Sequence, residues 1–175
     1  MFVFVKVIGI AMILTGCTMI GITVSGSFVR RIRELQDIKS FLAICETSMN
    51  DIGMHTPEIL RQSQAYLKTE VKAFLKSVSN RLQSEYPDSL AKIWKEEIEV
   101  HRHKLSLTEQ DLRVLADIGS FLGTTGPESQ RKLILRITGL LDKHMEDAEA
   151  LRSKNQKIML NMGVLGGLVL VLILL

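Results

Sequence analysis

The sequence has few of the residues that disulfide networks and base-stacking surfaces require. Aromatic side chains make up 5% of the 175 residues, and there are two cysteines and three prolines. In the polar part of the chain, apolar and polar residues do not alternate over four or more positions as they would along a half-buried strand. The formal charge of +3 combines both signs, and without interleaved aromatic residues it argues against nucleic-acid binding. These absences favour a helical protein.

Charge is missing from both ends of the chain. No charged residue occurs from Val7 to Phe28 or from Ile158 to Leu175. An apolar helix of roughly 20 residues crosses the hydrocarbon core of a membrane. The sequence therefore predicts three parts: an N-terminal transmembrane helix within residues 1–29, a polar domain at residues 30–157 and a C-terminal transmembrane helix at residues 158–175.

The first apolar run contains Leu14-Thr15-Gly16-Cys17, which is similar to the cleavage signal of a bacterial lipoprotein. The run continues well past this cysteine, whereas a signal peptide has an apolar region of about 7–15 residues. We therefore expect a retained helix. Its small residues Cys17, Gly21 and Ser25 are spaced four apart, which permits close packing against another membrane helix. A lipoprotein anchored at Cys17 is the alternative.

The second apolar run carries a similar packing motif. Gly163 and Gly167 form a Gly-x-x-x-Gly pair on one side of the helix, a spacing that lets membrane helices approach closely. The pair would contact a second copy of the chain or another component. A plain anchor with incidental glycines is the alternative.

Basic residues lie on the inner side of both apolar runs, toward the polar domain. Outside the runs there is only Lys6. Because basic residues near the ends of a span remain cytoplasmic, the polar domain is predicted to be cytoplasmic, and anionic membrane lipid accounts for the basic clusters. The clusters are Arg30, Arg31 and Arg33 after the first run, and Arg152, Lys154 and Lys157 before the second.

Periodic apolar residues divide the polar domain into helices. From the first basic cluster to Ile52 they recur at steps of three and four, as on one side of an amphipathic helix. A second helix is expected to begin at Thr56-Pro57-Glu58 and to continue to Leu82. Thr108 and Asp111 form a capping box that begins a fourth helix. The predicted fold is all-α, an antiparallel helical bundle between two terminal transmembrane helices.

The expected core is made of the apolar positions on the inner side of each helix. Cys45 is expected there as a small buried hydrophobe, and because Cys17 is predicted in the membrane no disulfide is expected. The other expected core residues are Leu35, Ile38, Leu42, Met49, Ile52, Leu60, Leu67, Val71, Phe74, Val78, Leu82, Leu90, Trp94, Ile98, Leu112, Leu115, Leu122, Ile134, Ile137, Leu141, Ala148 and Leu151.

No arrangement of residues indicates catalysis, and neither a cofactor nor a metal is predicted. His101 and His103 would point about 200° apart on a helix and could not share a metal ion, so we expect both to be exposed. His55 is expected in a turn. His144 interrupts an apolar seam and is expected to be a hydrogen-bonded core residue. The acidic residues Glu96, Glu97 and Glu99 are expected on a solvated face.

Short motifs in a fixed order resemble the stage III sporulation protein AB family of endospore-forming bacteria. Thr56 and Pro57 are similar to the Thr-Pro that begins a helix in that family. Leu122 and Gly123, with Gln130 seven residues after the glycine, resemble its Leu-Gly turn. The arginines after the first apolar run and the glycine-containing entry into the second also match.

The resemblance implies a non-enzymatic scaffold of the channel between mother cell and forespore, in the mother-cell membrane facing the forespore. The family is similar to the platform F proteins of type II secretion systems. The implied partners are the stage III sporulation ATPase (protein AA) and the other channel membrane proteins, with a homo-oligomer as a further option. Charges such as Glu96, Glu97, Arg102 and Lys104 would favour a polar contact with the ATPase. A membrane-anchored helical sensor is the competing functional class.

Overall fold

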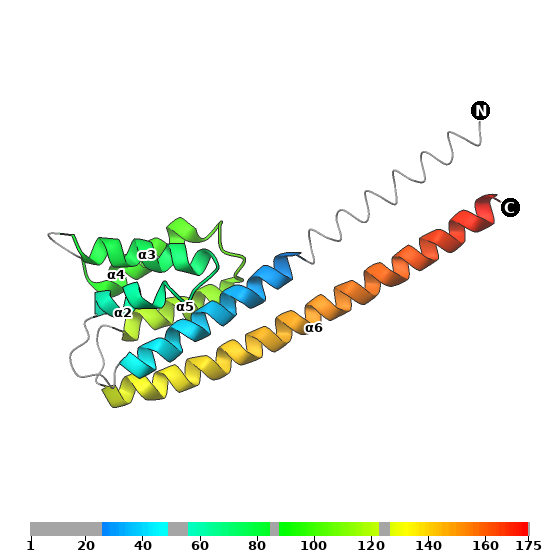
Figure 1. The fold of residues 1–175 in the computed structure, drawn as a ribbon. Helices are drawn as coiled ribbons and strands as arrows, with labels where there is room; N and C mark the ends of the chain where they lie inside the picture. The colour runs from blue at the N-terminus through cyan, green and yellow to red at the C-terminus, as the bar shows by residue number, and fades with distance from the viewer. Residues whose placement is uncertain (1–25, 49–55, 85–87, 123–126, 175) are drawn as a thin grey trace. The chain divides into compact units, whose positions relative to one another are not determined.

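The computed structural model describes residues 26–48, 56–84, 88–122 and 127–174, and every regular element in these ranges is an α-helix (Figure 1). Side chains are described as far as Ile158. Residues Arg30–Asp147 form one compact unit, which we call the bundle, and a second unit takes in the chain beyond it. The helical fold class expected from the sequence is confirmed for the described residues.

Six stretches of helix make up this part of the chain. The first covers residues 26–48. Three of the others begin with a hydroxyl side chain that accepts a backbone N–H, which satisfies a donor left unpaired at a helix start. The capping box predicted at Thr108 and Asp111 is confirmed. The later helices are α2 (Thr56–Ser63), α3 (Glu70–Leu82), α4 (Leu90–His101), α5 (Glu109–Phe121) and α6 (Pro127–Leu174).

The single helix expected from Thr56 to Leu82 is wrong, because the structure contains two helices there. α2 ends at Ser63 and α3 begins at Glu70. Thr69 adopts an extended backbone conformation, and its hydroxyl accepts the N–H of Val71 as an N-cap. Leu67 is nevertheless buried, so the apolar spacing continues across the break. Apolar periodicity alone therefore missed the interruption.

Trp94 is the centre of an aromatic core in the bundle. Its ring lies edge-on to Phe74 at 5.0 Å between centroids and 6.0 Å from the ring of Phe41. Its indole Nε1–H donates to the Leu115 carbonyl oxygen of α5 at 2.7 Å. A Cβ atom on Gly119 would lie 2.2 Å from Trp94 Cγ. Only glycine at position 119 therefore lets α4 and α5 pack this closely.

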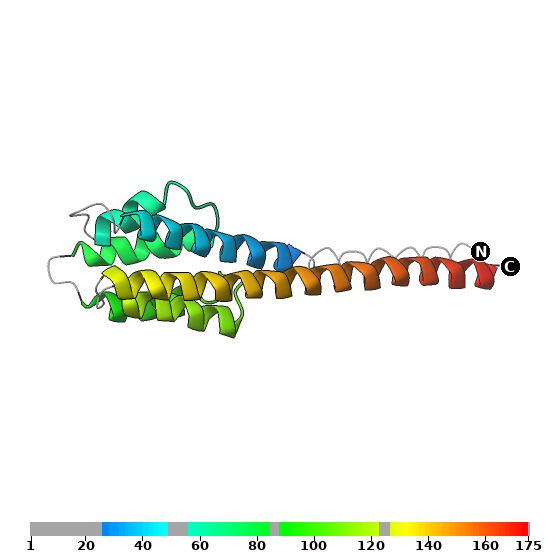
Figure 2. The ribbon, with the colours of Figure 1, turned by 90° about the horizontal axis from the view of Figure 1, so that it is seen from below.

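The helix at residues 26–48 runs antiparallel to the first part of α6. Lys39 Nζ lies 2.6 Å from the Asp142 carboxylate, and Glu46 lies 3.5 Å from Arg131. Residue numbers rise along one helix as they fall along the other. Both ribbon views show the two helices side by side within the bundle (Figures 1 and 2). The antiparallel arrangement predicted from the sequence is therefore present in this pair.

Most expected core positions are buried, from Leu35 in the first helix to Leu141 in α6. Cys45 is buried without a disulfide partner, and burial raises the pKa of its thiol to about 12. The expectation for Leu151 is wrong, because its side chain is 45% exposed and lies past the end of the bundle at Asp147. Phe41, which is 1% exposed, was missed. Met49 and Ile52 lie outside the described residues.

The predicted membrane helices fall largely outside the described side chains. Within the part of the chain that the structure describes, no helix combines the length and apolarity needed to cross a membrane. The first packing stripe, from Cys17 through Gly21 to Ser25, lies in residues 1–25, which are not described. The backbone of α6 is helical through Gly163 and Gly167, but the surroundings of that pair are not described.

Candidate functional site

Three buried charged residues follow one another along one side of the helix at residues 26–48. Arg31, Glu34 and Asp37 are 8%, 3% and 9% exposed. They are spaced by three residues, so they lie near one another along the helix surface. We call them the polar row. Each of them contacts a different segment of the bundle, so the row adds polar contacts to the apolar packing of the same helix.

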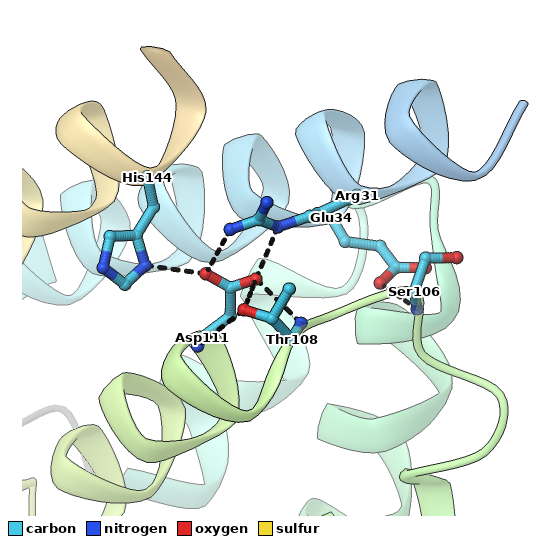
Figure 3. Close-up of polar contacts among 6 residues, drawn as sticks. All are labelled: Arg31, Glu34, Ser106, Thr108, Asp111 and His144. Atoms are coloured by element: carbon cyan, nitrogen blue, oxygen red, sulfur yellow. Dashed lines mark hydrogen bonds and ion pairs between the residues drawn. The ribbon is translucent and has the colours of Figure 1, made fainter. Parts of the chain in front are cut away.

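Arg31 forms the first contact of the polar row. Its Nε and Nη2 atoms donate to the two carboxylate oxygens of Asp111 at 2.7 and 3.1 Å (Figure 3). Asp111 is also the acid of the capping box at the start of α5, where it accepts the backbone N–H of Thr108 at 2.9 Å and the hydroxyl at 2.8 Å. One fully buried carboxylate therefore joins the first helix to the start of α5.

His144 brings α6 to the same carboxylate. Its Nδ1 lies 2.6 Å from Asp111 Oδ1, and because a carboxylate only accepts, Nδ1 carries the hydrogen. Burial by itself raises the pKa of Asp111, but hydrogen bonds from Arg31 and Thr108 outweigh it and lower the pKa. Five donors surround this group. Asp111 is therefore a structural joint between three helices, and the prediction that His144 is hydrogen-bonded in the core is confirmed.

Glu34 forms the second contact of the polar row. Its carboxylate accepts the backbone N–H of Ser106, just before α5, at 2.7 Å (Figure 3). Burial raises the pKa of Glu34 to about 7, and the nearby carboxylates of Glu70 and Asp37 add to that rise. Unlike Asp111, this carboxyl group has no arginine bonded to it among the described residues. The Ser106 hydrogen bond and the positive charge of Arg30 oppose the rise, so the charge of Glu34 is only partly compensated.

Asp37 forms the third contact of the row and explains the break between α2 and α3. One of its carboxylate oxygens accepts the backbone N–H groups of Lys68 and Thr69 at 2.9 and 2.8 Å, and the Thr69 hydroxyl at 2.8 Å. An acid at a helix start satisfies unpaired donors and favours the positive end of the helix dipole. The start of α3 is therefore held by a residue 32 positions earlier in the chain.

An open cleft of about 800 Å³ lies between the polar row and the start of α3. Its walls carry both signs of charge, and Glu34 is among the groups that line it. Tyr66, which also lines the cleft, is 64% exposed. The cleft is lined by Arg30, Arg33, Glu34, Gln36, Asp37, Ser40, Tyr66, Lys68, Thr69 and Glu70.

Two expectations for α4 are wrong. Glu97 was expected on a solvated face, but it is 7% exposed and accepts from Arg81 at 3.1 Å. His101 was expected to be exposed, but it is 6% exposed and its ring lies edge-on to Phe74. Both residues lie on the inner side of α4 because one turn separates them from each other and from buried neighbours. Glu96 and Glu99 are exposed as predicted.

The family-like motif residues fall at the ends of helices. Thr56 and Pro57 form the first turn of α2. Leu122 is buried just after α5, whereas Gly123 lies outside the described residues. Gln130 Nε2 donates to the Phe121 carbonyl oxygen at 3.2 Å. The glutamine therefore holds the start of α6 against the end of α5, which gives this motif a structural role.

Sequence reasoning did not bring Arg31, Asp111 and His144 together. The feature that could have indicated burial was the position of Arg31 and of His144 within an apolar pattern. Arg31 precedes Leu35 by four residues on the same seam, and His144 lies between Leu141 and Ala148. A charged residue in a seam position predicts a buried partner, but the pattern does not identify which of the many opposite charges that partner is.

Comparison with known proteins agrees with the resemblance. The model of the family described as stage III sporulation protein AB matches residues 6–175. The chain belongs to this family.

Two relatives extend the match. The stage III sporulation protein AB of Bacillus subtilis (strain 168) is 28% identical over 178 residues, which cover 97% of this chain and 98% of that protein. A solved structure of stage III sporulation protein AB (SpoIIIAB) superposes with a TM-score of 0.65 at 22% identity. It covers 71% of this chain and 98% of that one. This likeness shows that the two share the helical fold.

Proposed function

We propose that the protein is a non-enzymatic membrane scaffold of the sporulation channel between mother cell and forespore. The observation that carries this proposal is the joint at Asp111, where one buried carboxylate binds groups from three helices. Buried polar groups with every bond satisfied fix one arrangement of helices. A fixed arrangement suits a component that positions other proteins. Membership in the stage III sporulation protein AB family supplies the cellular setting.

Membrane anchoring is part of the proposal and rests on the two uncharged runs, Val7 to Phe28 and Ile158 to Leu175. The distribution of basic residues favours a cytoplasmic bundle with both ends of the chain directed outward. In this arrangement the bundle is the part of the protein that a cytoplasmic ATPase of the secretion type, such as stage III sporulation protein AA, can reach. The two glycine-containing runs would contact other channel proteins or a second copy.

The outward face of α4 is the surface that we propose for the ATPase. It carries the exposed residues Lys92, Lys95, Glu96 and Glu99 around Val100, which is 64% exposed. One exposed apolar residue within mixed charges favours a polar, salt-sensitive contact over a permanent apolar one. Glu97 is excluded from this surface because it is buried.

Cysteine labelling in intact cells tests the topology. Lys76 on α3 and Arg113 on α5 are exposed, and the native Cys45 is buried. A cysteine at position 76 or 113 should react with a membrane-impermeant maleimide only after the cells are opened. Reaction in intact cells would place the bundle outside and end the ATPase proposal. Intact-mass measurement of the membrane form is the matching test of Cys17, since acyl groups on a chain beginning there would establish a lipoprotein.

Co-purification tests the ATPase contact itself. The full chain should retain protein AA from sporulating cells at low salt and lose it at high salt, because rim charges are screened. Val100→Asp and Lys95→Glu should weaken retention at low salt. Arg113→Glu, on α5, is the matched control with an exposed side chain. Equal retention by all of these variants would exclude the α4 surface.

A further inference from the structure

The cleft beside the polar row is lined by charged groups of both signs. Arg30, Arg33 and Lys68 line it with cations, and none of their side chains forms an ion pair with another described residue. The acidic set is Glu34 and Glu70. Asp37 is part of the lining as well, but one of its oxygens is already occupied by the start of α3. The cleft therefore offers cationic groups to an anion and acidic groups to a cation.

Glu34 marks the place for the cation. It is 3% exposed, it lines the cleft, and its carboxylate has one described hydrogen bond, from Ser106. Burial raises its pKa to about 7 although the positive charge of Arg30 opposes that rise, and no cation forms a direct ion pair with it among the described residues. A ligand ammonium group beside it would form an ion pair with the carboxylate and donate hydrogen bonds to it.

The position of the cleft in the sequence points to the membrane surface as the source of the ligand. Arg30 is the first charged residue after the uncharged run that ends at Phe28. Arg33 follows within one helical turn, about 5 Å further along the axis. Tyr66, which lines the cleft, is 64% exposed, and tyrosine is enriched where membrane meets water.

We propose that this cleft binds the headgroup of an aminophospholipid, with its phosphate at Arg30, Arg33 and Lys68 and its primary ammonium at Glu34 and Glu70. The proposal rests on the membrane anchoring proposed above. It goes further, because it assigns the lipid to a defined cleft and selects one headgroup chemistry. A headgroup without a cation would leave Glu34 without a direct ion-pair partner, and a trimethylammonium group has no N–H to donate to it.

Native mass spectrometry of the full-length chain in detergent tests the proposal. Phosphatidylethanolamine, phosphatidylcholine and phosphatidylglycerol with identical acyl chains are titrated separately, and the bound lipid is counted. Phosphatidylethanolamine should bind at least roughly tenfold more tightly than phosphatidylcholine, which corresponds to one hydrogen bond to a charged group. Equal affinity for the two lipids would overturn the proposal.

Substitutions locate the binding. Glu34→Gln retains an acceptor for Ser106 and removes the charge, so it should abolish the preference for phosphatidylethanolamine over phosphatidylcholine. Glu70→Gln, at an exposed position, should reduce the preference without affecting folding. Arg33→Gln should weaken both phosphatidylethanolamine and phosphatidylglycerol severalfold. Lys76→Gln and Asp117→Asn, at exposed positions outside the cleft lining, are the controls and should change neither.

Two further outcomes would overturn the proposal. A preference for phosphatidylethanolamine that survives Glu34→Gln and Glu70→Gln would place the lipid elsewhere. Soluble phosphoethanolamine that displaces the lipid at an equal concentration would show that the ligand is a soluble zwitterion. Labelling of intact cells and retention of the ATPase are measured on the same Glu70→Gln protein. A reduced preference for phosphatidylethanolamine with both of these unchanged separates this proposal from the proposed function.

Discussion

Two regions of the bundle are held together by different physics. Around Trp94, α3, α4 and α5 meet through aromatic contacts and a glycine that permits close approach. Along the polar row, the first helix contacts the chain just before and within the first turn of α5, as well as the start of α3, through buried charges. The first region gains free energy by removing apolar surface from water. The second has to offset the cost of burying charge before it stabilises anything.

The difference shows what each region contributes to the scaffold. Apolar packing tolerates small shifts of one helix against another, because any side chain of similar size fills the space. The carboxylate of Asp111 does not tolerate such shifts, because its donors must lie within hydrogen-bond distance of both oxygens. We infer that the aromatic core supplies most of the stability, and that the polar row selects the alignment of the first helix.

The largest effect is expected at the Asp111 joint. Asp111→Ala leaves Arg31 buried without its partner and removes the acceptor for Thr108, so we expect a loss of about 3–5 kcal/mol. Urea unfolding of the full-length chain, followed by circular dichroism, measures it. Asp117→Ala, an exposed acid on the same helix, is the control and should change stability by less than about 0.5 kcal/mol. A loss at Asp111 as small as that of the control would mean that the charges are solvated.

The apolar core provides the matching measurement. Leu42 is fully buried in the first helix, and Leu42→Ala should cost about 2–5 kcal/mol through lost burial and the cavity left behind. The same unfolding experiment applies, with exposed Ala43→Ser as the neighbouring control. If Leu42→Ala costs less than about 0.5 kcal/mol, the seam of the first helix faces a partner or solvent and becomes a candidate docking surface.

Gly119 tests how closely α4 and α5 must approach. In an ordinary helix, replacing glycine by alanine stabilises by about 1 kcal/mol. Here the added methyl group would overlap Trp94, and we expect Gly119→Ala to destabilise by about 1–3 kcal/mol instead. Gly139→Ala is the matched control, because a Cβ atom there meets nothing within 4 Å. Thermal unfolding should shift in opposite directions for the two variants, and a shift in the same direction would contradict the packing.

The smallest expected effect is a dependence of stability on pH. Because the pKa of Glu34 is raised from 4.5 to about 7 in the folded protein, the folded state binds its proton more tightly than the unfolded state does. The favourable contribution of Glu34 to the free energy of unfolding is therefore complete below pH 4.5 and is lost as the pH rises to about 7. We expect on the order of 1 kcal/mol across this interval, because the cleft is open to water.

Comparison with Glu34→Gln isolates this contribution. The variant should lack that part of the pH dependence, while the remaining carboxylates titrate as before. Unfolding curves at pH 4.5, 6 and 7.5 provide the measurement for both proteins. Identical slopes in the two proteins would show that the Glu34 carboxyl group is hydrated and titrates normally.

Local patterns in the sequence were enough to predict the helical fold and most of the core. The spacing of apolar residues at steps of three and four predicted the buried sides of the helices. The capping box was predicted from Thr108 and Asp111, two residues at a fixed spacing. These features depend on neighbours within a turn or two, where the geometry of a helix is known in advance. The same local reasoning predicted that His144 would be bonded in the core.

Tertiary structure alone decided the partners of the polar row and the break before α3. Arg31 and Asp111 are 80 residues apart, and Asp37 ends the apparent continuity of α2 and α3 by holding a helix start 32 residues away. The burial of Glu97 and His101 likewise depends on tertiary contacts, because Arg81 meets Glu97 and Phe74 meets His101 only in the folded chain. Apolar burial follows a periodic rule, whereas a buried charge needs one particular partner, and only the path of the chain brings that partner to it.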